Sequence, residues 1–256
     1  MLQYEANDIW KGELILEYGK VHEVSFYSEL LDETFPILVY LPHEYSPMME
    51  YQVIFASDGK DYVQYGRIGR VTEDLVEEGD IEQTIVVGIP YDSVKHRWHL
   101  YHPHGERNDL YIDFLATELL PYIDETYPTI QDREARGLIG DSLAATVSLM
   151  TLIRYPELFS KAMLHSPLVN EKVIEAVENW NPSLPTTVYQ VVGDRETKVK
   201  TSGDGIKDFV EPNKELHQLL EEKNIDHFFE IFEGNHTWKY WQPDVPRAIR
   251  YAFRLY

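Results

Sequence analysis

Residues 137–145 read GLIGDSLAA, an apolar run that stops at Gly-Asp-Ser and continues into a helix-forming segment. The pattern predicts a buried strand, a sharp turn that carries Ser142, and a helix from Leu143 to Arg154. Small residues, Gly140 and Ala144, flank the turn, where a strand and a helix come too close for larger side chains. Such a strained turn lifts a serine hydroxyl out as a nucleophile. A serine that only caps the helix is the alternative interpretation.

Composition narrows the classes of function. The chain has 256 residues, 43% of them hydrophobic, which suits a single domain over residues 1–256 with a sizeable core. The formal net charge of −21 argues against nucleic acid or an anionic membrane as a partner. The absence of cysteine excludes disulfides and a thiolate nucleophile. Neither a secretory signal nor a membrane span is visible, so we expect a cytoplasmic protein, with a homodimer left open.

After an N-terminal β region, the chain alternates between strands and helices. We predict antiparallel strands at 12–17, 21–31 and 35–41. Further strands are predicted at 51–57, 83–89, 136–140, 161–165, 187–192 and 228–232, and helices at 68–78, 110–127, 143–154, 171–180, 213–223 and 238–254. Pro121 should kink or split the long helix that contains it. The alternation predicts an α/β fold with a mostly parallel central sheet, helices on both faces, and catalytic residues that follow its strands.

Two loops after the last predicted strands supply the partners that a serine nucleophile needs. His236 follows the last strand and is the candidate base, and Trp238 beside it is a candidate wall of the acyl pocket. Glu196 and Asp194 follow the preceding strand and are the candidate acids. Serine, acid and histidine in this chain order are typical of α/β-hydrolases. The carboxylate that does not serve the histidine is expected to pair with Arg195 or a neighbour.

An oxyanion hole needs two backbone N–H groups that point at one oxygen. The amide of Leu143, directly after the serine, is the first candidate. The strand at 51–57 ends in Asp58-Gly59-Lys60, and we choose the amide of Lys60 as the second, although these residues also suit an ordinary turn. Asp58 itself is a candidate for substrate binding.

Residues 95–104, KHRWHLYHPH, carry four histidines after the strand at 83–89. Pro103 and the aromatic residues favour a loop. Because no Asp or Glu is interleaved, a metal site is the weaker interpretation, and neither a metal nor another cofactor is expected. A loop that lines the substrate and a loop that packs on the sheet edge remain equal alternatives. Arg97 and Trp98 are candidates for binding an acidic or aromatic acyl group.

Five stretches carry a resemblance to a known family: FASDG at 55–59, FLATELLPYIDETY at 114–127, GDS at 140–142, YPELF at 155–159 with SP at 166–167, and GNHTW at 234–238. They resemble the esterases that include enterochelin-type siderophore esterases, esterase D, feruloyl esterases and the mycolyltransferase antigens. The resemblance implies an α/β-hydrolase fold, with Ser142 as nucleophile, His236 as base and amides near Lys60 and Leu143 as the oxyanion hole. The spacing of the acid in that family implies Glu196 ahead of Asp194.

This chain departs from the family at residues 144–145, where Ala-Ala stands in place of the usual Gly-Gly. Alanine still fits a close contact, so we expect no loss of catalysis. The expected function is a serine carboxylesterase that works through an acyl-enzyme on a small-molecule ester, such as a siderophore-like or aryl ester. An acyltransferase of the same fold and a non-catalytic binding member are the alternatives.

Overall fold

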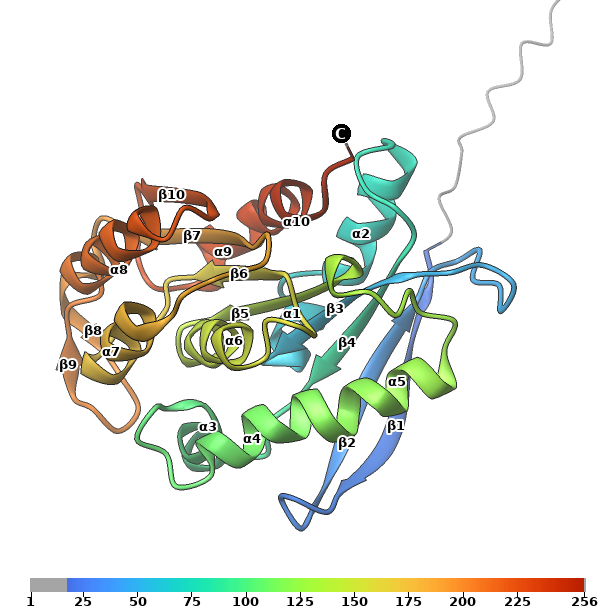
Figure 1. The fold of residues 1–256 in the computed structure, drawn as a ribbon, viewed down its shortest axis with the longest axis horizontal. Coiled ribbons are helices and arrows are strands. Elements are labelled where there is room, and N and C mark those ends of the chain that lie inside the picture. The colour runs from blue at the N-terminus through green and yellow to red at the C-terminus, as the bar shows by residue number, and fades with distance from the viewer. Residues whose placement is uncertain (1–17, 256) are drawn as a thin grey trace, which may run out of the picture.

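The structure is a computed structural model that describes residues 18–255, and its centre is an eight-stranded sheet (Figure 1). The strands lie in the order β1-β2-β4-β3-β5-β6-β7-β10. β1 is antiparallel to β2 and β2 to β4, whereas the other neighbours are parallel. The strands span Lys20–Ser28 (β1), Glu33–Leu41 (β2), Gln52–Ser57 (β3), Thr84–Ile89 (β4), Arg136–Asp141 (β5), Lys161–His165 (β6), Thr187–Gly193 (β7) and Asp226–Phe232 (β10).

The prediction of a mostly parallel sheet with antiparallel N-terminal strands is confirmed. The strand predicted at 12–17 lies outside the described residues. Every residue of β4, β5 and β6 is buried, which is typical of parallel strands covered by helices on both faces. Most predicted boundaries differ from the observed ones by only a few residues.

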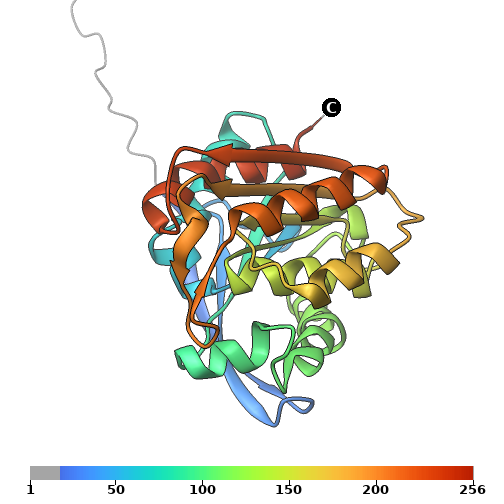
Figure 2. The ribbon, with the colours of Figure 1, turned by 90° about the vertical axis from the view of Figure 1, so that its left-hand side faces the viewer.

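Helices form a layer on each side of this sheet (Figures 1 and 2). One layer contains α1 (Gly59–Gln64), α2 (Ile68–Glu77) and α10 (Val245–Phe253). The other layer contains α3 (Val94–Tyr101), α4 (Asn108–Phe114), α5 (Leu120–Thr126), α6 (Leu143–Arg154), α7 (Glu171–Asn179) and α8 (Val210–Glu222). None of the helices between residues 18 and 255 is both long enough and apolar enough to cross a lipid bilayer.

The helix predicted at 110–127 is split, as expected from Pro121. α4 runs into a π-helical turn, Leu115–Leu119, and α5 begins one residue before the proline. Proline has no N–H to donate and its ring collides with the carbonyl four residues earlier, so a wider turn at this point relieves both problems.

The closing helix predicted at 238–254 is also interrupted. Its first part is α9 (Trp238–Trp241), which a 3₁₀ turn at Gln242–Asp244 separates from α10. Pro243 and Pro246 lack the N–H groups that a continuous helix would use here.

The loop predicted at 95–104 is wrong, because most of it is the helix α3. Ser93 is its N-cap: the side-chain oxygen accepts a hydrogen bond from the N–H of His96 at 3.2 Å. Residues 58–60, which also suited an ordinary turn, instead lead directly into a helix, since α1 begins at Gly59. A short hairpin of β8 (Val199–Lys200) and β9 (Ile206–Lys207) was not predicted.

Candidate active site

Ser142 occupies the turn between β5 and α6, which we call the elbow. Its backbone angles, φ 55° and ψ −121°, are unfavourable for an L-residue. A Cβ added to Gly140 would lie 2.2 Å from the carbonyl carbon of Ala144, so only glycine allows strand and helix to meet here. The side chain of Ser142 makes no capping hydrogen bond to α6, which speaks against the helix-cap alternative. Its own N–H donates to the carbonyl of His165 at 2.9 Å, which ties the turn to β6.

A buried carboxylate holds His236. Oε2 of Glu196 lies 2.6 Å from Nδ1 of His236, and the Glu196 side chain is fully buried. Its other oxygen, Oε1, accepts hydrogen bonds from the Gly193 N–H and the Ser166 hydroxyl, both at 2.8 Å. Because a carboxylate accepts at Oε2, Nδ1 carries the proton and Nε2 of His236 is left as the free acceptor.

Asp194 lies two residues away but faces outward. Its side chain is about half exposed, and Oδ1 accepts a hydrogen bond from the Gly234 N–H at 2.9 Å. The same oxygen lies 3.5 Å from Nε of Arg195, the ion pair expected of the carboxylate that does not serve the histidine.

Aromatic rings fix the plane of the His236 imidazole. The ring of Phe209 lies 4.5 Å from it and that of Trp241 lies 4.8 Å away at a near-perpendicular angle. Trp241 also donates its indole N–H to Ser166 at 3.0 Å. Sequence reasoning missed Phe209 and the role of Ser166. The position of Ser166 directly after β6 was a usable signal, whereas nothing local marks Phe209.

The serine and the histidine both follow the carboxyl ends of strands in one sheet, β5 and β10. Among residues 18–255, no hydrogen bond joins the hydroxyl of Ser142 to His236. In enzymes without substrate, catalytic hydrogen bonds are often long and tighten only when substrate binds.

The candidate oxyanion amides open two helices. Lys60 is in the first turn of α1 and Leu143 in the first turn of α6, and N–H groups in a first turn have no acceptor within their own helix. Asp58 precedes α1 in a left-handed conformation, φ 58°, at the point where the chain turns from β3 into the helix. A Cβ on Gly59 would come within 2.3 Å of Gly88, so this turn rests directly on β4.

The predicted substrate-binding residues contact other side chains of this chain. Asp58 and Arg97 pair with each other, and both side chains are largely buried. Trp98 stacks on His102 at 4.6 Å and donates its indole N–H to Asp204 at 3.4 Å, where the β8–β9 hairpin approaches α3 (Figures 1 and 2). Trp238 is partly exposed, and its ring meets that of Trp241, which in turn contacts His236.

The histidines of residues 95–104 contact separate carboxylates. His96 lies 2.8 Å from Glu33, and His102 lies 3.3 Å from Asp204. His104 reaches a third carboxylate on α7. In the part of the chain from residue 18 to 255, no group of three or more potential ligands could hold a metal ion.

Two cavities adjoin these residues. One, of about 690 Å³, is lined by Lys60 together with the rings of Phe35 and Tyr91 and the carboxylates of Glu23 and Asp92. The other, of about 420 Å³, is lined by Leu168 and Phe209 among others. One cavity therefore adjoins the candidate oxyanion residue Lys60, and the other adjoins Phe209, whose ring contacts His236.

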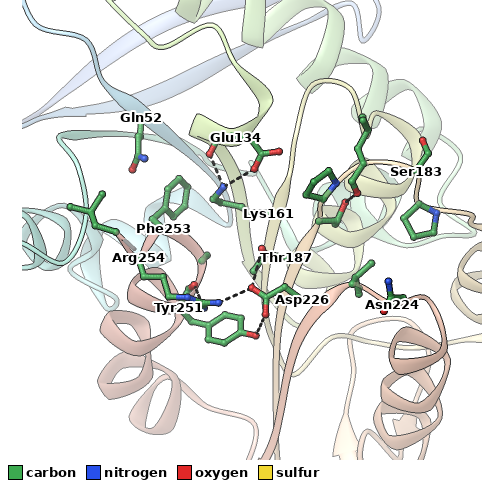
Figure 3. Close-up of a pocket in the computed structure, with 17 residues that line it drawn as sticks. Gln52, Glu134, Lys161, Ser183, Thr187, Asn224, Asp226, Tyr251, Phe253 and Arg254 are labelled. Carbon is green, nitrogen blue, oxygen red and sulfur yellow. Dashed lines mark hydrogen bonds and ion pairs between the residues drawn. The ribbon is translucent and has the colours of Figure 1, made fainter.

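A third cavity, of about 650 Å³, lies away from the elbow, at the amino ends of β3, β6, β7 and β10 (Figure 3). Lys161 donates to the carbonyl of Glu134 at 2.6 Å, and Asp226 accepts from Tyr251 and Arg254. These polar groups satisfy one another, and the cavity is remote from Ser142, so we assign it no part in the chemistry.

A buried hydrogen-bond network lies next to the elbow and includes His165, whose carbonyl accepts the Ser142 N–H. The Tyr62 hydroxyl donates to Nδ1 of His165 at 2.8 Å, and Nε2 of His165 donates to Asp244 at 3.2 Å. Asp244 also accepts from the hydroxyl of Tyr189 at 2.8 Å and from Arg247. The network thus connects α1, the end of β6 and the turn before α10.

The variant Asp244→Asn is expected to lower the free energy of unfolding by about 2 kcal/mol at neutral pH. Burial opposes the charge of Asp244, but hydrogen bonding to His165 and the nearby Arg247 outweigh it and hold the pKa of Asp244 below its usual value. A carboxylate with a lowered folded-state pKa stabilises the fold above its unfolded pKa, and this contribution is lost as pH falls through the folded value. Urea unfolding of both proteins should show the difference shrinking below about pH 4. A difference that stays constant into acid would contradict this account.

A sheet of this order, with a serine on the turn after its fifth strand, defines an α/β-hydrolase. The chain belongs to the Esterase family, described as "Putative esterase", whose model matches residues 28–252. Membership supports carboxylic-ester hydrolysis as the activity.

Two curated proteins illustrate the relationship. The chain is 47% identical over 232 residues to the uncharacterized protein YjcH of Bacillus subtilis (strain 168), a match that covers 91% of this chain and 97% of YjcH. It is 21% identical to an acetyl esterase of Caldicellulosiruptor saccharolyticus, with 92% and 98% of the two chains covered.

Solved structures share the fold. The BES protein from Bacillus cereus superposes with a TM-score of 0.75 at 21% identity, over 100% of both chains. The enterobactin esterase FES from Shigella flexneri, in the presence of enterobactin, superposes with a TM-score of 0.77 at 17% identity. That match covers 91% of this chain but 58% of FES. At these identities the likeness shows the fold alone.

Proposed function

We propose that this protein is a serine carboxylesterase with Ser142 as nucleophile, His236 as general base and Glu196 as the acid that orients the histidine. The observation that carries the proposal is the 2.6 Å hydrogen bond between buried Glu196 and Nδ1 of His236, on the same edge of the sheet as the strained elbow. A buried, multiply bonded carboxylate against one imidazole nitrogen leaves the other nitrogen to accept a proton.

The reaction proceeds in two halves. Nε2 of His236 takes the proton of the Ser142 hydroxyl as Oγ attacks the ester carbonyl, and the resulting tetrahedral oxyanion collapses when the alcohol leaves with that proton. His236 then takes a proton from water as that water attacks the acyl-enzyme, and the second tetrahedral intermediate releases the carboxylic acid while His236 returns the proton to Oγ of Ser142. Glu196 stabilises the imidazolium in both halves and stays ionised.

The amides of Lys60 and Leu143 are proposed to hold the oxyanion. Both are first-turn N–H groups without an intrahelical acceptor, and each helix begins directly after the carboxyl end of a strand, β3 or β5. Donors fixed before the reaction stabilise the charge without reorganising, which makes this usually the largest electrostatic contribution to catalysis.

For the substrate, we propose a neutral aryl ester in preference to an anionic siderophore complex. The cavity beside Lys60 combines the rings of Phe35 and Tyr91 with the carboxylates of Glu23 and Asp92. Aromatic walls favour an aryl group, whereas these carboxylates and the net charge of −21 repel anions.

Covalent labelling tests the proposal directly. A fluorophosphonate should modify the wild-type protein, and peptide mass spectrometry should place the adduct on Ser142. Neutral p-nitrophenyl and feruloyl-type esters should be hydrolysed faster than a ferric catecholate ester. Labelling elsewhere, or none, would refute the nucleophile. A product that contains an added alcohol in place of the free acid would instead indicate an acyltransferase.

A further inference from the structure

Arg97, on α3, connects the two turns that precede the proposed oxyanion amides. Its Nε donates to both carboxylate oxygens of Asp58, at 2.8 and 2.9 Å, and its Nη2 donates to one of them at 2.5 Å. The same Nη2 donates to the main-chain carbonyl of Asp141 at 3.1 Å. Asp58 directly precedes α1, and Asp141 directly precedes Ser142, so one guanidinium is bonded to both turns.

The surroundings of this contact restrict its movement. The side chains of Asp58 and Arg97 are only 2% and 14% exposed. The guanidinium lies over the rings of Tyr91 and Tyr101, at 5.7 and 5.6 Å from their centroids. Tyr101, one helical turn after Arg97, also accepts the Asp58 N–H with its hydroxyl at 3.4 Å. α3 therefore holds Asp58 by both its carboxylate and its amide.

We infer that Arg97 is a positioning residue. It fixes the turn at Asp58 against the elbow at Ser142 and thereby sets the separation of the Lys60 and Leu143 amides. The inference rests on the proposed function, since it assumes that these amides hold an oxyanion. Stabilisation of an oxyanion depends on donors at a defined distance, and a displacement of about 1 Å is costly. Because Arg97 donates to Asp58 and Asp141, we assign it this positioning role instead of the substrate binding that the sequence predicted.

The charges near the elbow agree with this role. Burial, together with the neighbouring Asp58 carboxylate, raises the pKa of Asp141 well above its usual value. Asp58 is the carboxylate whose oxygens accept the hydrogen bonds of the Arg97 guanidinium. Without Arg97, the buried negative charge of Asp58 would lie uncompensated near the developing oxyanion, which like-charge repulsion disfavours.

The variant Arg97→Lys tests the inference, because lysine keeps the charge but not the planar fork that reaches two turns. With p-nitrophenyl acetate, kcat should fall at least about tenfold while KM changes by less than about threefold. The affinity for a trifluoromethyl ketone, which forms an oxyanion on the serine, should fall by a similar factor. Arg107→Lys is the matched control, since Arg107 also binds a carboxylate, Glu33, and a backbone carbonyl but does not contact the elbow. Its kcat should stay within about twofold of wild type.

Asp58→Asn provides a second variant in case Arg97→Lys does not fold, because asparagine tolerates the left-handed backbone at this position. It should reproduce the loss in kcat, and the double variant should be little worse than either single one. A raised KM with kcat retained in Arg97→Lys would overturn the inference and return Arg97 to substrate binding. A wild-type protein that neither hydrolyses esters nor reacts with a fluorophosphonate would overturn the proposed function itself, and the inference with it.

Discussion

Replacing Ser142 with alanine is expected to lower kcat for p-nitrophenyl acetate by about 10⁴-fold or more. In the proposed mechanism the variant loses the atom that forms the acyl-enzyme, while the proposed oxyanion amides and the neighbouring cavities stay in place. The thermal midpoint should be close to that of the wild type, since the side chain makes no capping bond to α6. Stopped-flow measurement of the burst of p-nitrophenol should show that the burst disappears.

Ser148→Ala is the matched control for this experiment. It removes a buried hydroxyl from the same helix, where Oγ donates to the carbonyl of Ala144 at 2.8 Å. Its activity should remain within about threefold of wild type, because a lost helix-internal hydrogen bond changes stability more than catalysis. Appreciable turnover by Ser142→Ala, beside a normal Ser148→Ala, would exclude Ser142 as the nucleophile.

The second large effect concerns the acid. Glu196→Gln should lower kcat by about 10³- to 10⁴-fold. The amide oxygen of glutamine can keep the bonds to Gly193 and Ser166, but its NH₂ group would face Nδ1 of His236. An amide donor there favours the imidazole tautomer with the proton on Nε2, where it cannot accept the serine proton.

Asp194→Asn is the paired comparison, since it removes the other candidate carboxylate from the same loop. The Asp194 side chain is about half exposed and, among residues 18–255, contacts only Gly234 and Arg195, so kcat should change by less than about threefold. Steady-state kinetics of the two variants would decide between the carboxylates. A large loss in Asp194→Asn with an active Glu196→Gln would reverse the assignment.

Sequence patterns predicted most of this fold because its decisive signals are local. The strand Lys161–His165 and the helix Leu143–Arg154 agree with their predictions residue for residue, since each is a continuous apolar or helix-forming run. The helix α3 was missed because the aromatic residues and Pro103 outweighed Ser93, a helix-start signal that was present.

The candidate site was harder to predict wherever it depends on contacts between distant residues. Spacing placed both Glu196 and Asp194 on the loop after β7, but the direction of each carboxylate depends on the 3₁₀ turn Glu196–Lys198, which no sequence pattern predicted. Arg97 and Asp58 are far apart in sequence, so their pairing left no periodic signal. The sequence suggested both as substrate-binding residues and did not indicate that they pair with each other.

The backbone conformation of Ser142 is unfavourable for stability, but the proposed chemistry needs a serine at this position. The angles φ 55° and ψ −121° are favourable for glycine but strained for serine, and the strain lowers the stability of the fold by about 1–3 kcal/mol. Glycine would relieve that strain but carries no hydroxyl. The proposed chemistry therefore depends on a residue that is not the most stable choice for its position. The close packing at Gly140 and the hydrogen bond from the Ser142 N–H to His165 must offset this loss of stability.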